Sequence, residues 1–185
     1  MSKLYDGLEP PIAEFIGRQR VFFVATAPAG AEGLVNLSPK GLDGFRILDE
    51  RTVAYLDLVG SGVETIAHLR ENGRIVLCFC AFEGPPKIVR LHGRGDWLEP
   101  GDEGFAALRA RFAEVPLEAA VRAVIRVRVE RVADSCGYGV PLYAYQGERR
   151  QLYEWAERKG VAKLADYRRE HNARSLDGLP GLRGS

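Results

Sequence analysis

The sequence has no long hydrophobic run. No apolar stretch of its 185 residues reaches the roughly 18–20 residues that a membrane-spanning helix needs. The N-terminal residues 1–9 also lack the charged-then-apolar layout of a secretory signal. We therefore expect a cytoplasmic protein without a membrane partner.

Cysteine and histidine are scarce, with three of each in the chain. Cys78 and Cys80 lie two apart in an apolar stretch, so they share one face of a strand and cannot easily bridge each other. Cys136 stands alone, and the cysteines and histidines show no metal-ligand spacing. We expect free, buried thiols in a reducing compartment and no metal centre.

Charge of one sign is also lacking. The formal net charge is +1, and the arginine-rich runs alternate with apolar or acidic residues, so a nucleic-acid partner is not expected. Hydrophobic residues make up 46% and charged residues 28% of the chain, which is typical of a soluble globular protein. The length predicts a single domain over residues 1–185, with a helical extension from about residue 147.

Short segments rich in β-branched and aromatic residues predict about six strands, and helical patterns lie mostly near the two ends of the chain. This is not the alternation of strands and helices found in a parallel sheet. Gly93 and Gly95 interrupt one strand, as a bulge or sharp bend does. We predict a mainly β fold, a small antiparallel barrel with peripheral helices. The expected strands are 21–27, 34–38, 45–48, 52–58, 74–82, 87–98 and 120–132, and the expected helices are 10–20, 61–73, 102–112, 148–158 and 161–171.

A glycine turn joins the strand over residues 52–58 to the next helix. Ser61, with Glu64 three residues later, has the pattern of a capping box, and Gly73 suits the left-handed residue that ends a helix. Because the first backbone N–H groups of a helix attract anions and Gly60 has no Cβ, a phosphate can approach this turn closely. The alternative is an ordinary connection between a strand and a helix.

Two further segments carry polar groups suited to the same anion. Asn36 and Ser38 lie two apart on a strand and share a face, and Lys40 adds a charge at the strand end. Thr65, one turn into the helix, offers a hydroxyl, and Arg90 offers a guanidinium fork. The alternatives are a solvent-facing polar row for the first group and a surface charge for Arg90.

Three motifs in this order resemble a known family. They are Val-Asn-Leu-Ser-Pro-Lys-Gly at 35–41, Tyr-Leu-Asp-Leu at 55–58 followed by Ser61, and Lys-Ile-Val-Arg-Leu-His-Gly at 87–93. From about residue 15 to residue 132 the chain resembles the FMN-binding split barrels grouped with pyridoxamine 5′-phosphate oxidase. The resemblance implies a six-stranded antiparallel split barrel, a homodimer and an FMN cofactor shared between subunits.

The resemblance also implies which residues contact FMN. The first strand would touch the ring or ribityl chain, the backbone of the second strand would touch the cofactor, and the turn with its helix would hold the phosphate, helped by Lys40 or Arg90. The implied FMN-binding residues are Asn36, Ser38, Lys40, Leu56, Asp57, Ser61, Gly62, Thr65 and Arg90.

Three departures from the oxidase separate this chain from the oxidase's own reaction. Gly62 and Val63 stand where the oxidase has Arg-Lys, Val35 stands where it has arginine, and residues 175–185 lack its substrate motif. Residues 135–141 and 176–182 instead resemble a bacterial subgroup that carries the oxidase name by homology. The implied function is therefore an FMN-dependent oxidoreductase with an unknown small-molecule substrate.

Two alternatives stay open beside that function. One is a non-catalytic protein that binds or senses flavin, and the other keeps the fold but binds a deazaflavin or haem. Residues 135–145, rich in glycine and tyrosine, are either a substrate contact or a structural loop over the barrel end.

Overall fold

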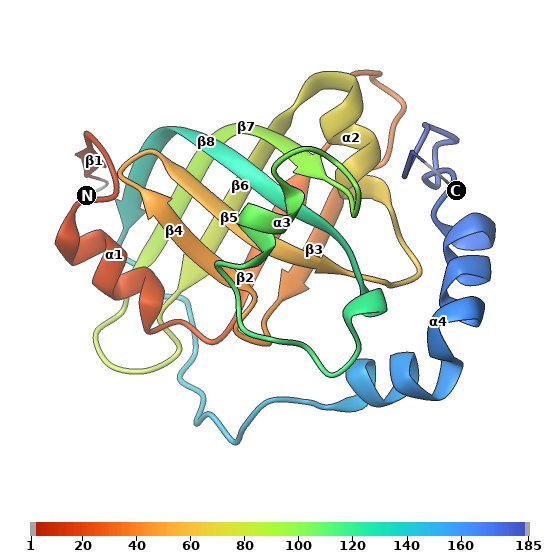
Figure 1. Ribbon diagram of the computed structural model, residues 1–185. Helices are drawn as coiled ribbons and strands as arrows, with labels where there is room; N and C mark the ends of the chain where they lie inside the picture. Colours follow the sequence, from red (N-terminus) through yellow and green to blue (C-terminus); the bar gives the residue numbers. More distant parts are fainter. Residues whose placement is uncertain (1–2, 184–185) are drawn as a thin grey trace.

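A single antiparallel sheet dominates the computed structural model, which describes residues 3–183 (Figure 1). The short strand β1 (Leu4–Tyr5) adds to β8 outside the main order of seven strands. That order begins at β3 and ends at β4, so these two strands form the edges where the barrel is split. It runs β3 (Asn36–Lys40), β2 (Phe22–Thr26), β6 (Arg74–Cys80), β7 (Ile88–Leu98), β8 (Val121–Ser135), β5 (Thr52–Leu58) and β4 (Phe45–Asp49).

The mainly β, antiparallel fold predicted from the sequence is confirmed, but the sheet has eight strands, against the seven segments expected from the sequence and the six that the family resemblance implies. The short β4 pairs with β5 and belongs to the sheet. The strand β1 was not predicted, because two residues are too few to show alternation. Its pairing with β8 depends on contacts with residues about 130 positions later, among them the 2.5 Å hydrogen bond from the Tyr5 hydroxyl to Asp134.

Helices surround the sheet: α1 (Pro10–Gly17), α2 (Glu64–Asn72), α3 (Phe105–Arg109), the 3₁₀ turn η1 (Glu118–Ala120) and α4 (Gln151–His171). The two predicted C-terminal helices form α4, which is interrupted at Gly160 by a non-helical φ of 71°. Helix α3 is shorter than predicted. Beyond α4 the chain folds back onto α2, where Arg70 donates to the carbonyl of Gly181 at 3.0 Å. Residues 184–185 of the predicted tail lie outside the described part.

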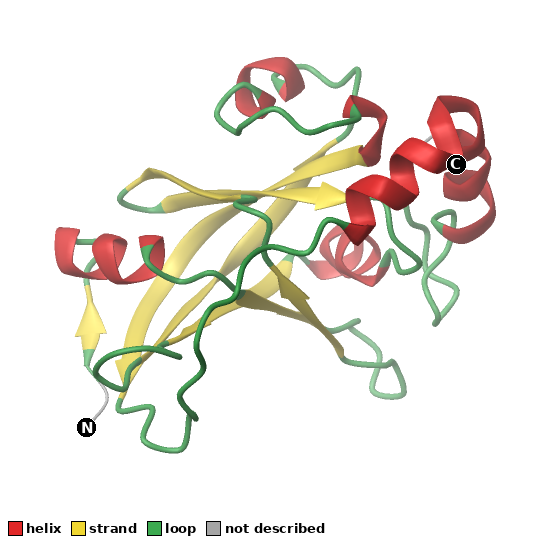
Figure 2. Ribbon diagram, turned by 90° about the horizontal axis from the view of Figure 1, so that it is seen from below, coloured by secondary structure: helices red, strands yellow, loops and turns green. Residues whose placement is uncertain are grey.

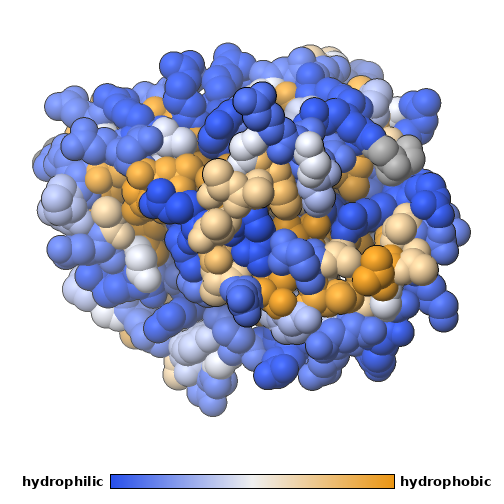
Figure 3. Space-filling view, in the orientation of Figure 1, coloured by the Kyte–Doolittle hydropathy of each residue, from blue (hydrophilic) through white to orange (hydrophobic). Residues whose placement is uncertain are grey.

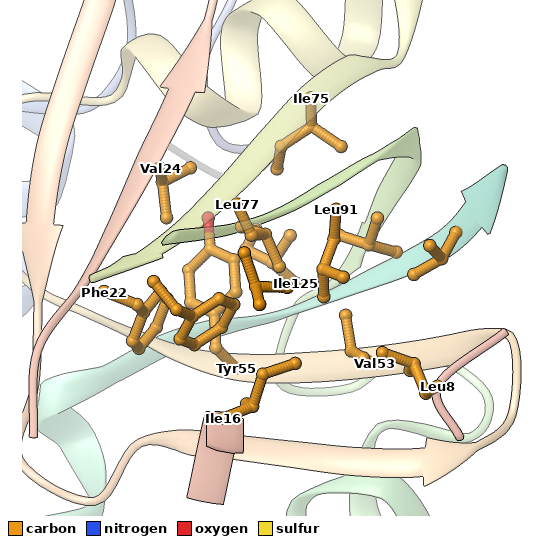
Figure 4. Close-up of a cluster of buried hydrophobic side chains, with 14 of the residues drawn as sticks. Leu8, Ile16, Phe22, Val24, Val53, Tyr55, Ile75, Leu77, Leu91 and Ile125 are labelled. Atoms are coloured by element: carbon orange, nitrogen blue, oxygen red, sulfur yellow. The ribbon is translucent and has the colours of Figure 1, made fainter. Parts of the chain in front are cut away.

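The largest buried cluster fills the space between the sheet and α1. Figure 4 shows the Tyr55 ring among Phe22, Leu77 and Ile125. The Phe22 ring lies 5.5 Å from the Tyr55 ring and 5.6 Å from the Phe79 ring, distances at which aromatic pairs attract. These contacts fix the relative positions of β2, β5 and β6.

Two smaller clusters attach the remaining helices. Phe112, which follows α3, packs on Leu56 at the other face of β5, and Leu164 of α4 packs with Val59 and Ala120. Figures 1 and 2 both show α4 along one side of the sheet. Figure 3 shows apolar side chains across the middle of one face and hydrophilic ones around them. Within residues 3–183 there is no helix with the length and apolar character to cross a membrane.

The bulge predicted in the strand after residue 87 is present. The register of β7 against β8 shifts between His92 and Gly93. A Cβ built on Gly93 lies only 2.2 Å from the backbone oxygen of Arg128. Glycine is required here because the neighbouring backbone approaches too closely for any side chain.

Gly93→Ala is expected to destabilise the protein by about 1–3 kcal/mol, because the added methyl group clashes with backbone that cannot move aside easily. Urea unfolding followed by tryptophan fluorescence measures the change. Gly139→Ala is the control, because nothing lies within 4 Å of a Cβ at that position. Equal stability of the two variants would contradict the assignment of a close backbone approach at Gly93.

Candidate functional site

The polar residues of β3 point toward the interior side of the sheet. In the pairing of β3 with β2, Asn36 lies opposite Thr26 and Ser38 lies opposite Val24, whose side chain is fully buried. Directly opposed residues of antiparallel strands project from the same face. Asn36, Ser38 and Lys40 therefore share the face of the core, and they do not form the solvent-facing polar row considered as an alternative.

Asn36 organises the hydroxyl groups around it. Its Nδ2 donates to Oγ1 of Thr26 and to Oγ1 of Thr65, each at 3.1 Å, and its Oδ1 accepts from the Ser38 hydroxyl at 3.1 Å. Both amide hydrogens are thus used within the chain. Asn36 consequently positions Thr65 and Ser38, whose own orientations decide what a ligand meets.

A buried histidine extends this network behind β3. The Thr26 hydroxyl lies 2.9 Å from Nδ1 of His68, and this histidine is completely buried. Burial lowers the pKa of His68, which favours the neutral ring. Because Thr26 already accepts from Asn36, its proton can go to Nδ1, which leaves the ring hydrogen on Nε2, 4.0 Å from a carboxylate oxygen of Asp177.

Asp57 holds two cations at the end of β5. Its carboxylate binds Nε of Arg122 at 2.7 Å and Nζ of Lys40 at 3.3 Å, and its side chain is 1% exposed. Burial alone would raise the pKa of this carboxyl group, but Arg122 and Lys40 outweigh burial and hold the pKa below its ordinary value. The three side chains therefore form a charged group joining β3, β5 and β8.

These residues surround a cavity of about 130 Å³. Five of the nine predicted cofactor-binding residues line it, together with one cation that sequence reasoning missed, Arg122. Since whole-ligand pockets usually measure about 300–1,000 Å³, this cavity suits a group the size of a phosphate rather than an entire flavin. Its lining is Asn36, Ser38, Lys40, Leu58, Gly60, Gly62, Glu64, Thr65 and Arg122.

The predicted capping box at the start of α2 is wrong. The helix begins at Glu64 with Val63 at the N-cap, and no side chain caps it. Ser61 stays exposed in the turn and is not part of the cavity lining. Glu64 instead accepts a hydrogen bond from the backbone N–H of Leu176 at 3.2 Å, so the C-terminal segment takes the carboxylate that a capping box would use. The left-handed cap predicted at Gly73 is confirmed, with a φ of 69°.

Two other predicted residues are not brought to the cavity. The backbone N–H of Leu56 donates to Gly44 at 2.9 Å, and its side chain packs in the cluster with Phe112. Arg90 lies within β7, where its guanidinium donates to the Ser135 hydroxyl at 3.0 Å. Of the three segments predicted to converge on one anion, only the first two line the cavity. The third does not, because Arg90 bonds to Ser135, where the predicted loop over residues 135–145 begins.

Arg122 was missed because it opens a strand in which arginines alternate with apolar residues. Arg126 and Arg128 in the same strand are indeed exposed, whereas Arg122 is 5% exposed. The available signal was Asp57, a carboxylate inside an apolar strand. Such a group needs a cationic partner when it is buried, and Arg122 supplies one.

Asp57→Asn is expected to destabilise the protein by about 3–5 kcal/mol, because it leaves Arg122 buried without its partner. In the wild type this contribution is present above the ordinary aspartate pKa of about 3.9, and it is lost as pH falls through the lower pKa of the folded state. Urea unfolding at neutral pH and in stepwise acid measures both effects, and the variant should show the flatter pH profile.

Asp43→Asn is the matched control, because Asp43 pairs with Arg46 on an exposed surface, where an ion pair contributes little. A loss of stability as large as that of Asp57→Asn would show that burial of the pair is not the cause.

Comparison with known proteins shows the family. A family model described as pyridoxamine 5′-phosphate oxidase matches residues 8–136. The pyridoxamine 5′-phosphate oxidase family protein ustO of Aspergillus flavus is 39% identical over 197 residues, which cover 98% of this chain and 78% of that protein.

Solved structures show the same fold at low identity. HupZ of Group A Streptococcus has a TM-score of 0.53 and 22% identity, covering 69% of this chain and 99% of that one. A FAD-binding protein of Mesorhizobium loti has a TM-score of 0.51 and 18% identity, covering 72% and 96%. With the family model matching well over half of its length, the chain belongs to the pyridoxamine 5′-phosphate oxidase family.

Proposed function

We propose that this protein is a cytoplasmic FMN-dependent oxidoreductase acting on a small molecule. The observation that carries the proposal is the small cavity in which Lys40, Thr65 and Arg122 meet beside a glycine turn, in a member of this family. When bound, the flavin supplies hydride transfer, and the protein supplies position and electrostatics.

The cavity has the donors that a phosphate requires. Lys40 and Arg122 bring two positive charges and share the single negative charge of Asp57, while Glu64 adds one further carboxylate to the lining. The Thr65 hydroxyl accepts from Asn36 and lies in the lining of the cavity. Gly60 offers a surface without a Cβ. We assign the flavin phosphate to this cavity.

The isoalloxazine ring does not fit into about 130 Å³, so most of the cofactor lies outside the cavity. Lys40 ends the polar row of β3. Its side chain is 25% exposed and that of Arg122 is 5% exposed, so Lys40 is the cation of the cavity that solvent, and a flavin ring outside the cavity, can reach. There it would stabilise negative charge on a reduced flavin. Asn36 and Ser38 keep the proposed role of lining the path from the phosphate to the ring.

We also propose a homodimer. The outward side chains of β2, β3 and β6 form a face that no helix of residues 3–183 covers, with Leu37 opposite Ala25 and Ala25 opposite Val76. Leu37 is 65% exposed. Leu37, exposed between half-buried apolar neighbours on a sheet face, gives a surface of the kind at which two chains associate. A partner chain on this face would also lie next to β3 and could complete the flavin site.

A second candidate function is the binding or sensing of a flavin, a deazaflavin or haem without catalysis. It is favoured by Gly62 and Val63, which leave the turn without the charges of the oxidase, and by the FAD-binding protein of Mesorhizobium loti with the same fold. An absorption spectrum of the purified protein separates flavin, deazaflavin and haem. Turnover assays with reduced nicotinamide cofactors and common electron acceptors then separate catalysis from binding.

Lys40→Met is expected to weaken FMN binding about tenfold, because one charge-assisted hydrogen bond to the phosphate is lost while Arg122 keeps its bond to Asp57. Quenching of flavin fluorescence during titration measures the affinity. Lys163→Met, an exposed change on α4, is the charge-matched control and should bind as the wild type does. Equal affinity for both variants would place the phosphate elsewhere, and no FMN uptake by the wild type would end the proposal.

Leu37→Glu is expected to convert the dimer to a monomer, because a two-fold interface places the new charge against an apolar surface twice. Size-exclusion chromatography with light scattering gives the mass. Val161→Glu adds the same charge at a residue that is 63% exposed on α4, away from this face, and should leave the mass unchanged. A monomeric wild type, or a dimeric Leu37→Glu variant, would refute this interface.

A further inference from the structure

A second cavity lies on the other side of Arg122. It measures about 190 Å³ and is bounded by α4, by the turn after β7 and by the C-terminal segment. Arg122 lines this cavity as well as the one assigned to the flavin phosphate. Two further arginines of α4, Arg168 and Arg169, complete its basic wall, and Leu182 closes one side.

Arg168 is the feature of this cavity that needs an explanation. Its guanidinium donates to the carbonyl of Ala119, but its Nε is buried without a hydrogen-bond partner. Across residues 3–183, Arg168 forms no ion pair with a carboxylate. Burial lowers the pKa of Arg168, the nearby charge of Arg122 lowers it further, and the charge of Glu99 opposes both. Arg122 shares the Asp57 carboxylate with Lys40, so the two neighbouring arginines carry more positive charge than the carboxylates beside them balance, and a bound anion would stabilise the fold here.

The acid in the lining offsets them only in part. Glu99 accepts from the Trp97 ring nitrogen at 2.8 Å and from the Arg183 backbone N–H at 3.0 Å, and it lies 3.4 Å from Nε of Arg183. Arg183 also binds Asp102 at 2.6 Å, so Glu99 keeps part of its charge for Arg168. Arg169 has an ion pair with Asp166, but both side chains are largely exposed, where such pairs are weak. Within the lining itself, three arginines face this one carboxylate.

We propose that this cavity is a second anion-binding site, for a phosphate or carboxylate group. Planar guanidinium groups recognise both groups through paired hydrogen bonds, and the Nε of Arg168 supplies a donor with no other use. This proposal rests on the proposed function in one respect, which is that the neighbouring cavity holds the flavin phosphate. The anion belongs either to a second phosphate of a dinucleotide flavin or to an acidic substrate.

Inorganic phosphate is the probe for this site. Isothermal titration of FMN-saturated protein with phosphate, at constant ionic strength, reports the second cavity because FMN fills the first. We expect one phosphate per chain in the wild type and about tenfold weaker binding for Arg168→Gln. Arg158→Gln is the matched control, since Arg158 lies on the same helix but bonds only to the carbonyl of Glu154.

Three results would overturn the proposal. They are no phosphate binding by FMN-saturated wild type, equal binding by the wild type and Arg168→Gln, and an equal loss in Arg158→Gln. Arg169→Gln is a second variant of the same cavity at an exposed position, so it keeps the test decisive if Arg168→Gln does not fold. If the protein takes up no flavin, the same comparison on the flavin-free protein still tests this cavity, so the two proposals fail separately.

FAD distinguishes the two sources of the anion. If Arg168→Gln weakens FAD binding but not FMN binding, and FAD displaces phosphate, then the second phosphate of a dinucleotide occupies the cavity. If phosphate still binds to FAD-saturated wild type, then the cavity receives the acidic group of a substrate. Both results support the site.

Discussion

The bond from the buried Asp57 carboxylate to Arg122 and Lys40 is the interaction on which the site depends. It joins β3, at one edge of the sheet, to the neighbouring strands β5 and β8 near the other edge. A buried carboxylate is stable only with partners, so Lys40 is held at the end of β3 and Arg122 at the start of β8. These two ion pairs thus connect the strands on either side of the split in the barrel. They also hold two cations beside a cavity that suits a phosphate.

Much of the fold could be predicted because its signals are local. Alternation along β8, the glycines of β7 and the left-handed Gly73 each follow from neighbouring residues, and the structure has all three. The cavity residues that could be predicted share a strand face, as Asn36, Ser38 and Lys40 do, or lie in the glycine turn and the helix after it, as Gly62 and Thr65 do. Arg122 and the role of Glu64 depend on contacts with residues 65 and 112 positions away, which no local pattern records.

The failure of the capping box has a physical cause in this long-range packing. Ser61 and Glu64 have the spacing of a reciprocal cap, but the C-terminal segment offers Glu64 the backbone N–H of Leu176 instead. In the same segment the Asp177 carboxylate accepts from the backbone N–H of Leu34 at 3.0 Å and so fixes the chain before β3. The tertiary contact between Glu64 and Leu176 therefore outweighs the local tendency of Ser61 and Glu64 to form a cap. Ser61 stays exposed in the turn beside the cavity.

Arg122 lines both cavities, so its position determines where an anion can bind on each side of it. Its Nε is bound by Asp57, and its Nη1 lies 3.5 Å from the carbonyl of Gly60, so the guanidinium is held between the glycine turn and α4. A charge held in this way attracts anions on both sides without moving. Because α4 and the C-terminal segment build the second side, this part of the chain, where the oxidase carries its substrate motif, would select the anion that we propose for the second cavity.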